Sequence, residues 1–308
     1  MKKNQVSLTA LGTTYMRAYH AMHDVPKIFN DFLAYSILTE EERIALEKQY
    51  TPSVQFIKTI DPISAASCHN DASALAWSMR AGPGTSHTLS RSRYTEDKLE
   101  EAVKHGVKQY VILGAGMDTF AFRRPELVEQ LQVFEVDHPA TQAFKRNRLI
   151  ELGWEKTSQL HFIPVDFTQD SLSTALAQSS YNQQAKSFFS WLGVTMYLTR
   201  DEVFATLRAI ANVAPAGSAV IFDYMDTDAF DPERVNKRMQ LAMELVQQMG
   251  EPLITGFNPL TLDADLRRLD ICLHENLSPS DIEEHYFQER KDGYHACEHV
   301  HFAWAIVK

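Results

Sequence analysis

Two glycines separated by one residue directly follow a short apolar run, and this spacing can bring the backbone close to a ligand. The run covers residues 110–113, and Gly114 and Gly116 come immediately after it. Glycine permits a tight turn and places no side chain between the chain and a bound group. A dinucleotide-binding loop would carry a third glycine where Thr119 stands, so this loop is less suited to a pyrophosphate. A plain turn between a strand and a helix is the alternative interpretation.

Aspartates follow the next two apolar runs, and each could contact one part of a nucleoside. The carboxylate of Asp137, after residues 132–136, could accept hydrogen bonds from both ribose hydroxyls. Asp166 and Phe167 close residues 161–165, where a carboxylate could accept from an adenine amine and a backbone N–H could donate to the ring. Either aspartate could instead cap the following helix. Ligands of open α/β sheets bind at the carboxyl ends of strands, so the order of these residues predicts a nucleotide site.

The elements that must position these residues alternate between short apolar runs and helical stretches. Such an alternation predicts a parallel sheet with right-handed crossovers. The last run is long and alternating, which suits an antiparallel strand added to that sheet. The expected strands are residues 110–113, 132–136, 161–165, 187–193, 219–224, 271–276 and 299–307.

Helical patterns occupy the N-terminal third and a segment after the fifth expected strand. Thr39 is suited to cap a helix over residues 40–47, and residues 82–86 indicate a break before a helix at 94–105. Residues 232–250 predict one long amphipathic helix. We therefore expect a single domain over residues 1–308. Its parts would be a helical cap (1–105), a cofactor-binding core (106–225), an inserted helical lid (226–265) and the final strands (266–308).

The composition is that of a globular protein, and it excludes several classes. Hydrophobic residues make up 44% and charged residues 23%, with a net charge of −10. The densest basic stretch, residues 145–148, is short, so we expect no nucleic-acid partner and no attraction to anionic lipid. Three widely spaced cysteines indicate neither a disulfide framework nor a zinc site. With no signal peptide and no apolar run that could span a bilayer, we expect a cytoplasmic protein without membrane contact.

Longer motifs surround these residues: SRYTED at 92–97, VILGAGMDT at 111–119, FEVDHP at 134–139, PVDF at 164–167 and WLGVTMYLT at 191–199, with MRAY at 16–19 and FND at 29–31. Together they resemble the leucine carboxyl methyltransferase family, most closely its bacterial branch of O-methyltransferases that use S-adenosylmethionine (SAM). The resemblance spans roughly residues 8 to 225. It implies the class I methyltransferase fold, an α/β Rossmann-like architecture with a seven-stranded, mostly parallel sheet and an antiparallel last strand.

The resemblance also implies a role for each residue of the nucleotide site. Gly114 and Gly116 would lie against the cofactor, which is SAM or its product S-adenosylhomocysteine. Asp137 would hold the ribose. Asp166 and Phe167 would hold the adenine.

Two arginines, out of three candidates, are implied at the methionine end of the cofactor. Arg17 and one member of the pair Arg91 and Arg93 would face the methionine carboxylate, because a guanidinium pairs with a carboxylate through two hydrogen bonds. For Arg91 and Arg93 the alternative is a surface ion pair with Glu96 or Asp97.

The sequence assigns no catalytic residue. Methyl transfer requires alignment and dryness, and a carboxylate acceptor needs no base, whereas a hydroxyl would be helped by one. His20, His138 and Tyr197 are candidates for that base, but a structural role is expected for each. The histidine-rich residues 295–301 could suggest a metal site. We interpret them as a hydrated strand edge and expect no metal.

These patterns predict a SAM-dependent methyltransferase that acts on a carboxylate or hydroxyl of a small molecule, with the acceptor bound between the lid and the N-terminal helices. The oligomeric state is not indicated. An NAD(P)-dependent oxidoreductase is the first alternative, because it shares two glycines and a distant acid. A SAM-binding protein without catalysis is the second. Its support is Leu192, which stands where relatives often carry a glutamate associated with the amino end of the cofactor.

Overall fold

The computed structural model describes residues 6–308, which fold around one seven-stranded sheet with the order β3–β2–β1–β4–β5–β7–β6. Strands β1 to β5 run parallel to one another, whereas β7 is antiparallel to both β5 and β6. The predicted sheet, with its reversed last strand, is therefore confirmed. The strands are β1 (Gln109–Leu113), β2 (Gln132–Asp137), β3 (Leu160–Pro164), β4 (Ser187–Trp191), β5 (Ala219–Met225), β6 (Ile271–Leu277) and β7 (Val300–Val307).

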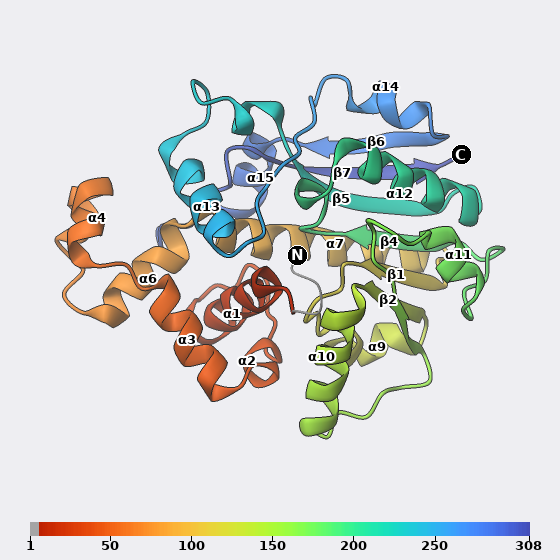
Figure 1. Ribbon diagram of the computed structural model, residues 1–308, viewed down its shortest axis with the longest axis horizontal. Coiled ribbons are helices and arrows are strands. Elements are labelled where there is room, and N and C mark those ends of the chain that lie inside the picture. Colours follow the sequence, from red (N-terminus) through yellow and green to blue (C-terminus); the bar gives the residue numbers. More distant parts are fainter. Residues whose placement is uncertain (1–5) are drawn as a thin grey trace.

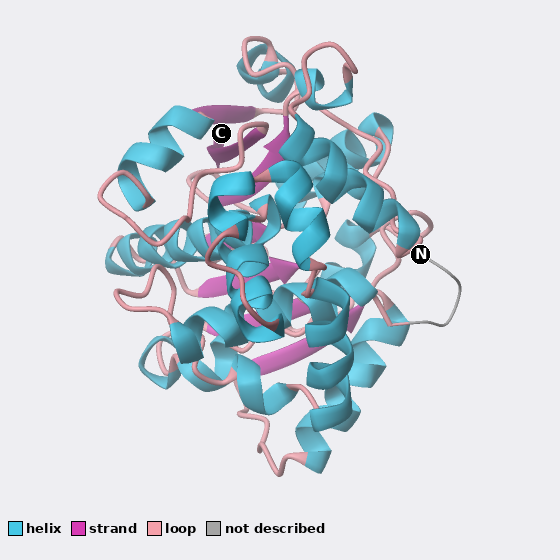
Figure 2. Ribbon diagram, turned by 90° about the vertical axis from the view of Figure 1, so that its left-hand side faces the viewer, coloured by secondary structure: helices cyan, strands magenta, loops and turns pink. Residues whose placement is uncertain are grey.

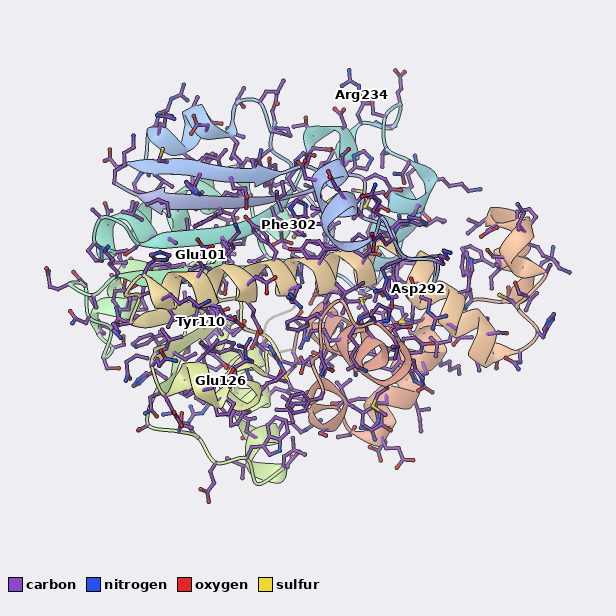
Figure 3. The ribbon with its side chains drawn as sticks, turned by 180° about the vertical axis from the view of Figure 1, so that it is seen from behind. Glu101, Tyr110, Glu126, Arg234, Asp292 and Phe302 are labelled. Carbon is purple, nitrogen blue, oxygen red and sulfur yellow. The ribbon has the colours of Figure 1, made fainter. Side chains whose placement is uncertain are left out.

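Helices cover both faces of the sheet (Figure 2). The long helix α7 runs across one face, close to Tyr110 and Phe302 (Figure 3), and α12 packs on the other face. The helices before β1 are α1 (Leu8–His23), α2 (Ala34–Ile37), α3 (Glu40–Tyr50), α4 (Val54–Ile60), α5 (Pro62–Ala65), α6 (Asp71–Ala81) and α7 (Pro83–Lys104). Those after it are α8 (Phe120–Arg123), α9 (Pro125–Val128), α10 (Pro139–Glu151), α11 (Leu172–Ala177), α12 (Arg200–Val213), α13 (Lys237–Gln248), α14 (Leu262–Arg267) and α15 (Pro279–Tyr286), with short 3₁₀ turns at Thr195–Tyr197 and Thr227–Phe230.

The burial of β1 on both faces explains why the central strands are wholly apolar in sequence. Tyr110 and Ile112 belong to the core under α7, whereas Val111 and Leu113 belong to the core under α12. All residues of β1 are buried, and full burial of one aliphatic side chain contributes about 1.5–3 kcal/mol. Burial on both faces, combined with parallel neighbours on both sides, fixes the end of β1 and the start of the glycine loop.

Helices α1 to α6 lie together at one end of the sheet, beside α13 (Figure 1). Helices α1, α2, α3 and α6 share a core around Tyr15, Tyr50 and Met79, whereas α4 and α5 pack with α6 around Ile57 and Ala74. Thr39 caps α3 through a capping box with Glu42, as the sequence predicted. Helix α1 also contacts α7, so the N-terminal helices are anchored to the face of the sheet that α7 covers.

Three features differ from the sequence predictions. Helix α7 begins at Pro83 rather than near residue 94, because Gly82 and Pro83 form the cap and first turn of a helix instead of a loop. Helix α13 begins only at Lys237, since the side chain of Asn236 caps it by accepting the N–H of Met239 at 2.8 Å. The interpretation of residues 295–301 as a hydrated strand edge is wrong for His299 and His301, because both are buried and β7, which contains His301, lies between β5 and β6.

Within residues 6–308, no helix is both long and apolar enough to cross a membrane.

Candidate functional site

A cavity of about 1080 Å³ opens at the carboxyl ends of β1 to β4. Its floor is formed by the loops that follow these strands, and its walls come from α1, α7 and α13. Most of the lining side chains are apolar, with a few charged groups among them. A concave, mostly apolar site with few polar groups is typical of a small-molecule pocket. Its position agrees with the expected binding edge of an open α/β sheet.

The loop after β1 has the geometry that its glycines predict. Gly114 and Gly116 both adopt positive φ angles, +71° and +51°, which side-chain-bearing residues rarely adopt. A Cβ atom on Gly114 would lie 2.4 Å from Cγ2 of Val194, in the loop after β4. The loop after β1 can therefore pack against the loop after β4 only because this position has no side chain.

Asp137, the last residue of β2, lies across from this loop and lines the cavity. One carboxylate oxygen accepts the backbone N–H of Gly116, and the other accepts the N–H of His138 at 2.6 Å. Burial raises the pKa of Asp137, although these two hydrogen bonds oppose the rise. A carboxylate has about four acceptor positions, so two remain for a ligand's hydroxyl groups.

Asp166 and Phe167 lie after β3 and also line the cavity. Asp166 accepts the N–H and hydroxyl of Thr168 at 3.0 and 2.7 Å and the amide of Gln169 at 2.9 Å. Partial burial opposes ionisation of Asp166, but these hydrogen bonds lower its pKa. The Phe167 ring packs against Trp191, with ring centroids 6.2 Å apart. An anionic acceptor and an aromatic face are thus held together at this wall.

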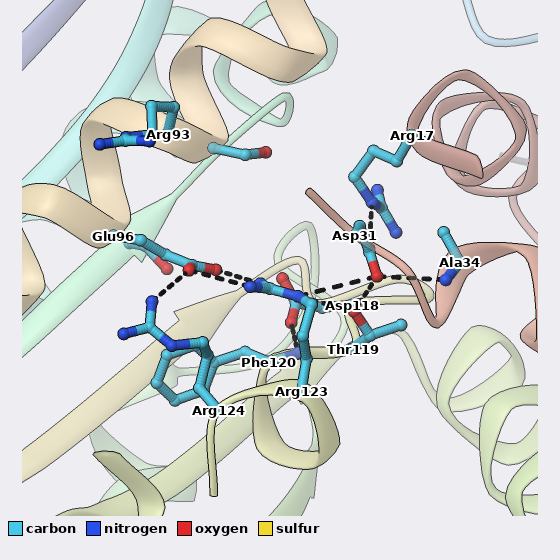
Figure 4. A network of polar contacts seen from close by, with 12 residues as sticks. Arg17, Asp31, Ala34, Arg93, Glu96, Asp118, Thr119, Phe120, Arg123 and Arg124 are labelled. Atoms are coloured by element: carbon cyan, nitrogen blue, oxygen red, sulfur yellow. Dashed lines mark hydrogen bonds and ion pairs between the residues drawn. The ribbon is translucent and has the colours of Figure 1, made fainter. Parts of the chain in front are cut away.

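The structure places two of the three candidate arginines at the cavity. Arg17 lines it from α1, and its Nε donates to Asp31 at 2.8 Å (Figure 4). Arg91 lines it from α7. Arg93 lies two residues further along α7 and does not line the cavity. Its side chain is half-exposed and pairs with Asp97 at 2.8 Å.

A network of ion pairs holds the wall around Arg17 (Figure 4). Asp31 accepts hydrogen bonds from Arg17 and, at 2.6 Å, from the hydroxyl of Thr119. Glu96 on α7 pairs with Arg123 and, at 2.9 Å, with Arg124. Thr119, which replaces the third glycine of a dinucleotide loop, therefore anchors the loop to the N-terminal segment instead of approaching a phosphate.

The structure adds two residues that the sequence did not predict, His87 and Asp223. His87 lines the cavity from α7, one turn before Arg91. Asp223, in the middle of β5, is fully buried and accepts from His87 Nε2 at 2.5 Å and from Arg91 Nη1 at 2.9 Å. A second oxygen of Asp223 accepts the N–H of Gly193 at 2.6 Å. One signal was available in the sequence, because an aspartate inside an apolar strand must find a partner when buried.

The three residues considered as bases have other contacts. His20 is fully buried away from the cavity, bonded to Asp24 at 2.8 Å and to the N–H of Ile28. His138 lines the cavity, and its Nδ1 accepts the N–H of Ala140 at 3.2 Å at the start of α10. Tyr197 also lines the cavity, but burial raises its pKa to about 12.

The C-terminal histidines converge on one carboxylate. His299 Nδ1 and His301 Nε2 lie 3.0 and 3.6 Å from the carboxylate of Asp226. Among the residues that the structure describes, no group of three His, Cys, Asp or Glu side chains has the arrangement of a metal site.

The donor set matches the chemical parts of SAM. Asp137 can accept from ribose hydroxyls, Asp166 and Phe167 offer an acceptor and an aromatic face for adenine, and Arg17 and Arg91 are cations for a carboxylate. Gly114 and Gly116 line the cavity, and their positive φ angles let the backbone of this loop border the space for such a ligand. The residues present therefore fit this cofactor.

Known proteins share both the sequence pattern and the fold. The family model described as "Leucine carboxyl methyltransferase" matches residues 10–211. A Bacillus subtilis (strain 168) protein named "Putative S-adenosyl-L-methionine-dependent methyltransferase YktD" is 36% identical over 310 residues, with both chains covered in full. A protein of Mycobacterium sp. (strain JLS) named "Putative S-adenosyl-L-methionine-dependent methyltransferase" is 30% identical over 162 residues, 52% of each chain.

Two solved structures share the overall fold at low sequence identity. A DUF574 family protein from Streptomyces avermitilis superimposes with a TM-score of 0.57 and 9% identity over 99% of each chain. A protein from Thermobifida fusca, titled a putative methyltransferase, gives a TM-score of 0.55 and 12% identity over 88% of this chain and all of the other.

The sheet order and the two solved structures define a class I methyltransferase fold. Within that class, the chain belongs to the leucine carboxyl methyltransferase family, and it is a SAM-dependent methyltransferase.

Proposed function

We propose that this protein transfers the methyl group of SAM to an oxygen atom of a small, largely apolar acceptor, either a carboxylate or a hydroxyl. Asp137 would hold the ribose, Asp166 and Phe167 the adenine, and Arg17 with Arg91 the methionine carboxylate. The observation that carries the proposal is the shared cavity, which brings all five of these side chains together at one edge of the sheet.

The acceptor would bind in the part of the cavity that these five residues do not line. This part is bounded by Met225 and Val300, at the ends of β5 and β7, and by Met239 and Leu245 of α13. Thioether and aliphatic side chains favour an apolar, adaptable contact surface. We propose that residues 226–265, which contain α13, act as the lid over this acceptor subsite.

When bound, SAM supplies an activated methyl group and a sulfur leaving group. The chain has to align the acceptor with that methyl group and exclude water. Arg91 and Arg17 would fix the methionine end, because their guanidinium groups are held by Asp223 and Asp31 respectively. The lid and α1 would close the cavity, since Glu251 after α13 accepts hydrogen bonds from Thr9 of α1.

Titration calorimetry with SAM, S-adenosylhomocysteine and NADH tests this proposal. We expect SAM or its product to bind and to raise the melting temperature, and Asp137→Ala to weaken binding by roughly 2–4 kcal/mol through the loss of two charge-assisted hydrogen bonds. Asp97→Ala is the control, because Asp97 pairs with Arg93 outside the cavity. Binding of NADH in place of SAM, or SAM affinity within twofold of wild type in Asp137→Ala, would contradict the proposal.

A further inference from the structure

We propose that His87 is the general base of the methyl transfer, positioned by Asp223, and that the acceptor carries a weakly acidic hydroxyl group rather than a carboxylate. This inference rests on the proposed function and narrows its substrate class. The two residues lie 136 positions apart in the chain and meet only because α7 packs on β5.

The hydrogen bonds of Asp223 determine which nitrogen of His87 carries a proton. Arg91, His87 and the N–H of Gly193 surround the buried carboxylate, and they hold the pKa of Asp223 far below its usual range although burial opposes this. An ionised carboxylate can only accept, so Nε2 of His87 must be the donor in their contact at 2.5 Å. Arg91 Nη1 lies 3.3 Å from the same nitrogen but donates to Asp223 at the shorter distance of 2.9 Å. The neutral ring then has its lone pair on Nδ1, which forms no hydrogen bond with any residue from 6 to 308.

The protonation state of His87 suits a base. Burial and the positive charge of Arg91 lower the pKa of His87, and the carboxylate of Asp223 only partly opposes them. The ring is therefore neutral at pH 7 and able to take a proton. Asp223 would in turn stabilise the imidazolium that forms, as a carboxylate does in other histidine–aspartate pairs.

The surroundings of His87 place it beside the acceptor subsite. The His87 ring stacks on the ring of Phe302, with centroids 6.3 Å apart. Phe302 of β7 is the strand partner of Asp223 in β5. Two residues further along the same strands, the pair of Met225 and Val300 lines the cavity. Side chains two apart on a strand share one face and lie about 7 Å apart, so the His87 ring borders the apolar floor of the subsite.

Arg91 separates His87 from the loop that follows β4. Its guanidinium covers Gly193, where a Cβ atom would lie 2.5 Å from both Nη atoms. Arg91 thus faces the end of β4, on the cofactor side, whereas His87 faces β5 and β7, on the acceptor side.

The proposed step balances as follows. The acceptor hydroxyl gives its proton to Nδ1 of His87 while its oxygen forms a bond to the methyl carbon. The bond between that carbon and the positively charged sulfur breaks, and its electron pair stays on the sulfur, which becomes a neutral thioether. The imidazolium later returns its proton to water. A carboxylate acceptor would have no proton to lose, and the pair of His87 and Asp223 would then be unnecessary.

The test uses 4-nitrophenol, a hydroxyl probe that absorbs visible light only when ionised, added with S-adenosylhomocysteine at a pH about one unit below the pKa of the probe. We expect the wild-type protein to bind the probe and increase its ionised fraction. In His87→Gln this increase should be at least tenfold smaller. His138→Gln is the matched control, because its ring lines the same cavity but forms no hydrogen bond with a carboxylate: its Nε2 lies 3.9 Å from Asp166. In ¹⁵N-labelled protein without ligands, NMR should show His87 neutral at pH 7 with the proton on Nε2.

Affinity for SAM separates this inference from the proposed function. His87→Gln should bind SAM within about threefold of wild type, whereas a wild-type protein that does not bind SAM would refute the proposed function itself. Equal ionisation of the probe in His87→Gln, no binding of the probe, a proton on Nδ1, or a loss of SAM affinity as large as in Arg91→Gln would each overturn the role of His87.

Discussion

The hydroxyl of Tyr294 donates to the carboxylate of Asp24 at 2.8 Å, and this contact joins the loop before β7 to the end of α1. Asp24 is buried and also accepts from His20 at 2.8 Å and from Arg80 of α6 at 2.7 and 3.0 Å. One carboxylate therefore connects three segments that enclose the N-terminal side of the cavity.

We predict that Asp24→Asn lowers the free energy of unfolding by about 3 kcal/mol at pH 7, because it leaves Arg80 without its charged partner. Asp97→Asn, which breaks the exposed pair with Arg93, should change it by less than about 0.5 kcal/mol. Urea denaturation of both variants measures the difference. Equal effects of the two substitutions would show that the buried contact adds no stability.

The same substitution should give a defined pH dependence. Burial would raise the pKa of Asp24, but hydrogen bonds from His20, Tyr294 and Arg80 lower it to about 2. A depressed pKa in the folded state stabilises the protein above the unfolded value of about 4. The stability difference between wild type and Asp24→Asn should thus stay constant from pH 5 to 8 and shrink as the pH falls from about 4 towards 2.

Much of the fold could be predicted because buried parallel strands have a plain signature. The run at 110–113 is apolar throughout because both of its faces are buried. Most residues of the antiparallel β7 are also buried, so its polar and apolar residues alternate less strictly. The loop glycines and Asp137 could be predicted because they follow such runs directly. Each of these signals is local in the sequence.

The rest of the site depends on contacts between distant segments. Residues 82–86 predicted a break, so His87 was not expected on a helix that faces the cavity. Arg91 and Arg93 could not be distinguished by spacing, because only the packing of α7 decides which of them points to the sheet. The lining of the acceptor subsite by Val300 depends on the pairing of β5 with β7.

The pair Arg91 and Arg93 offers a direct test of the methionine end. Arg91→Gln should raise the dissociation constant of SAM at least tenfold, because a charge-assisted hydrogen bond contributes about 1.5–3 kcal/mol. Arg93→Gln, on the same helix but outside the cavity, should leave it within twofold. Calorimetry with SAM measures both, and a larger loss in Arg93→Gln would reverse the assignment.

Gly114 tests whether the loop after β1 needs its glycine. Gly114→Ala should lower the free energy of unfolding by roughly 2–3 kcal/mol, because φ is +71° and the new Cβ would lie 2.4 Å from Val194. The double variant with Val194→Ala should regain the stability lost through the steric clash, but not the stability lost through the strained backbone at position 114. The single Val194→Ala variant completes the cycle. No recovery in the double variant would show that Val194 is not the obstacle.

The lid proposal predicts that α13 is less stable than the sheet it covers. Of its residues Lys237–Gln248, only Met239 is buried, whereas every residue of β1 is. Segments with few buried contacts open more often, and their amide hydrogens exchange faster. We expect the amides of α13 to exchange faster than those around Leu113, and the hydrogen bonds from Ser7 and Thr9 to Glu251 to be the point at which the lid closes.

Deleting residues 232–250 and bridging the gap should abolish methyl transfer but leave SAM affinity within about threefold, because none of the proposed cofactor contacts lies in this segment. If α13 is as protected as β1, or if its deletion removes SAM binding, then it belongs to the cofactor-binding core and the acceptor must bind elsewhere.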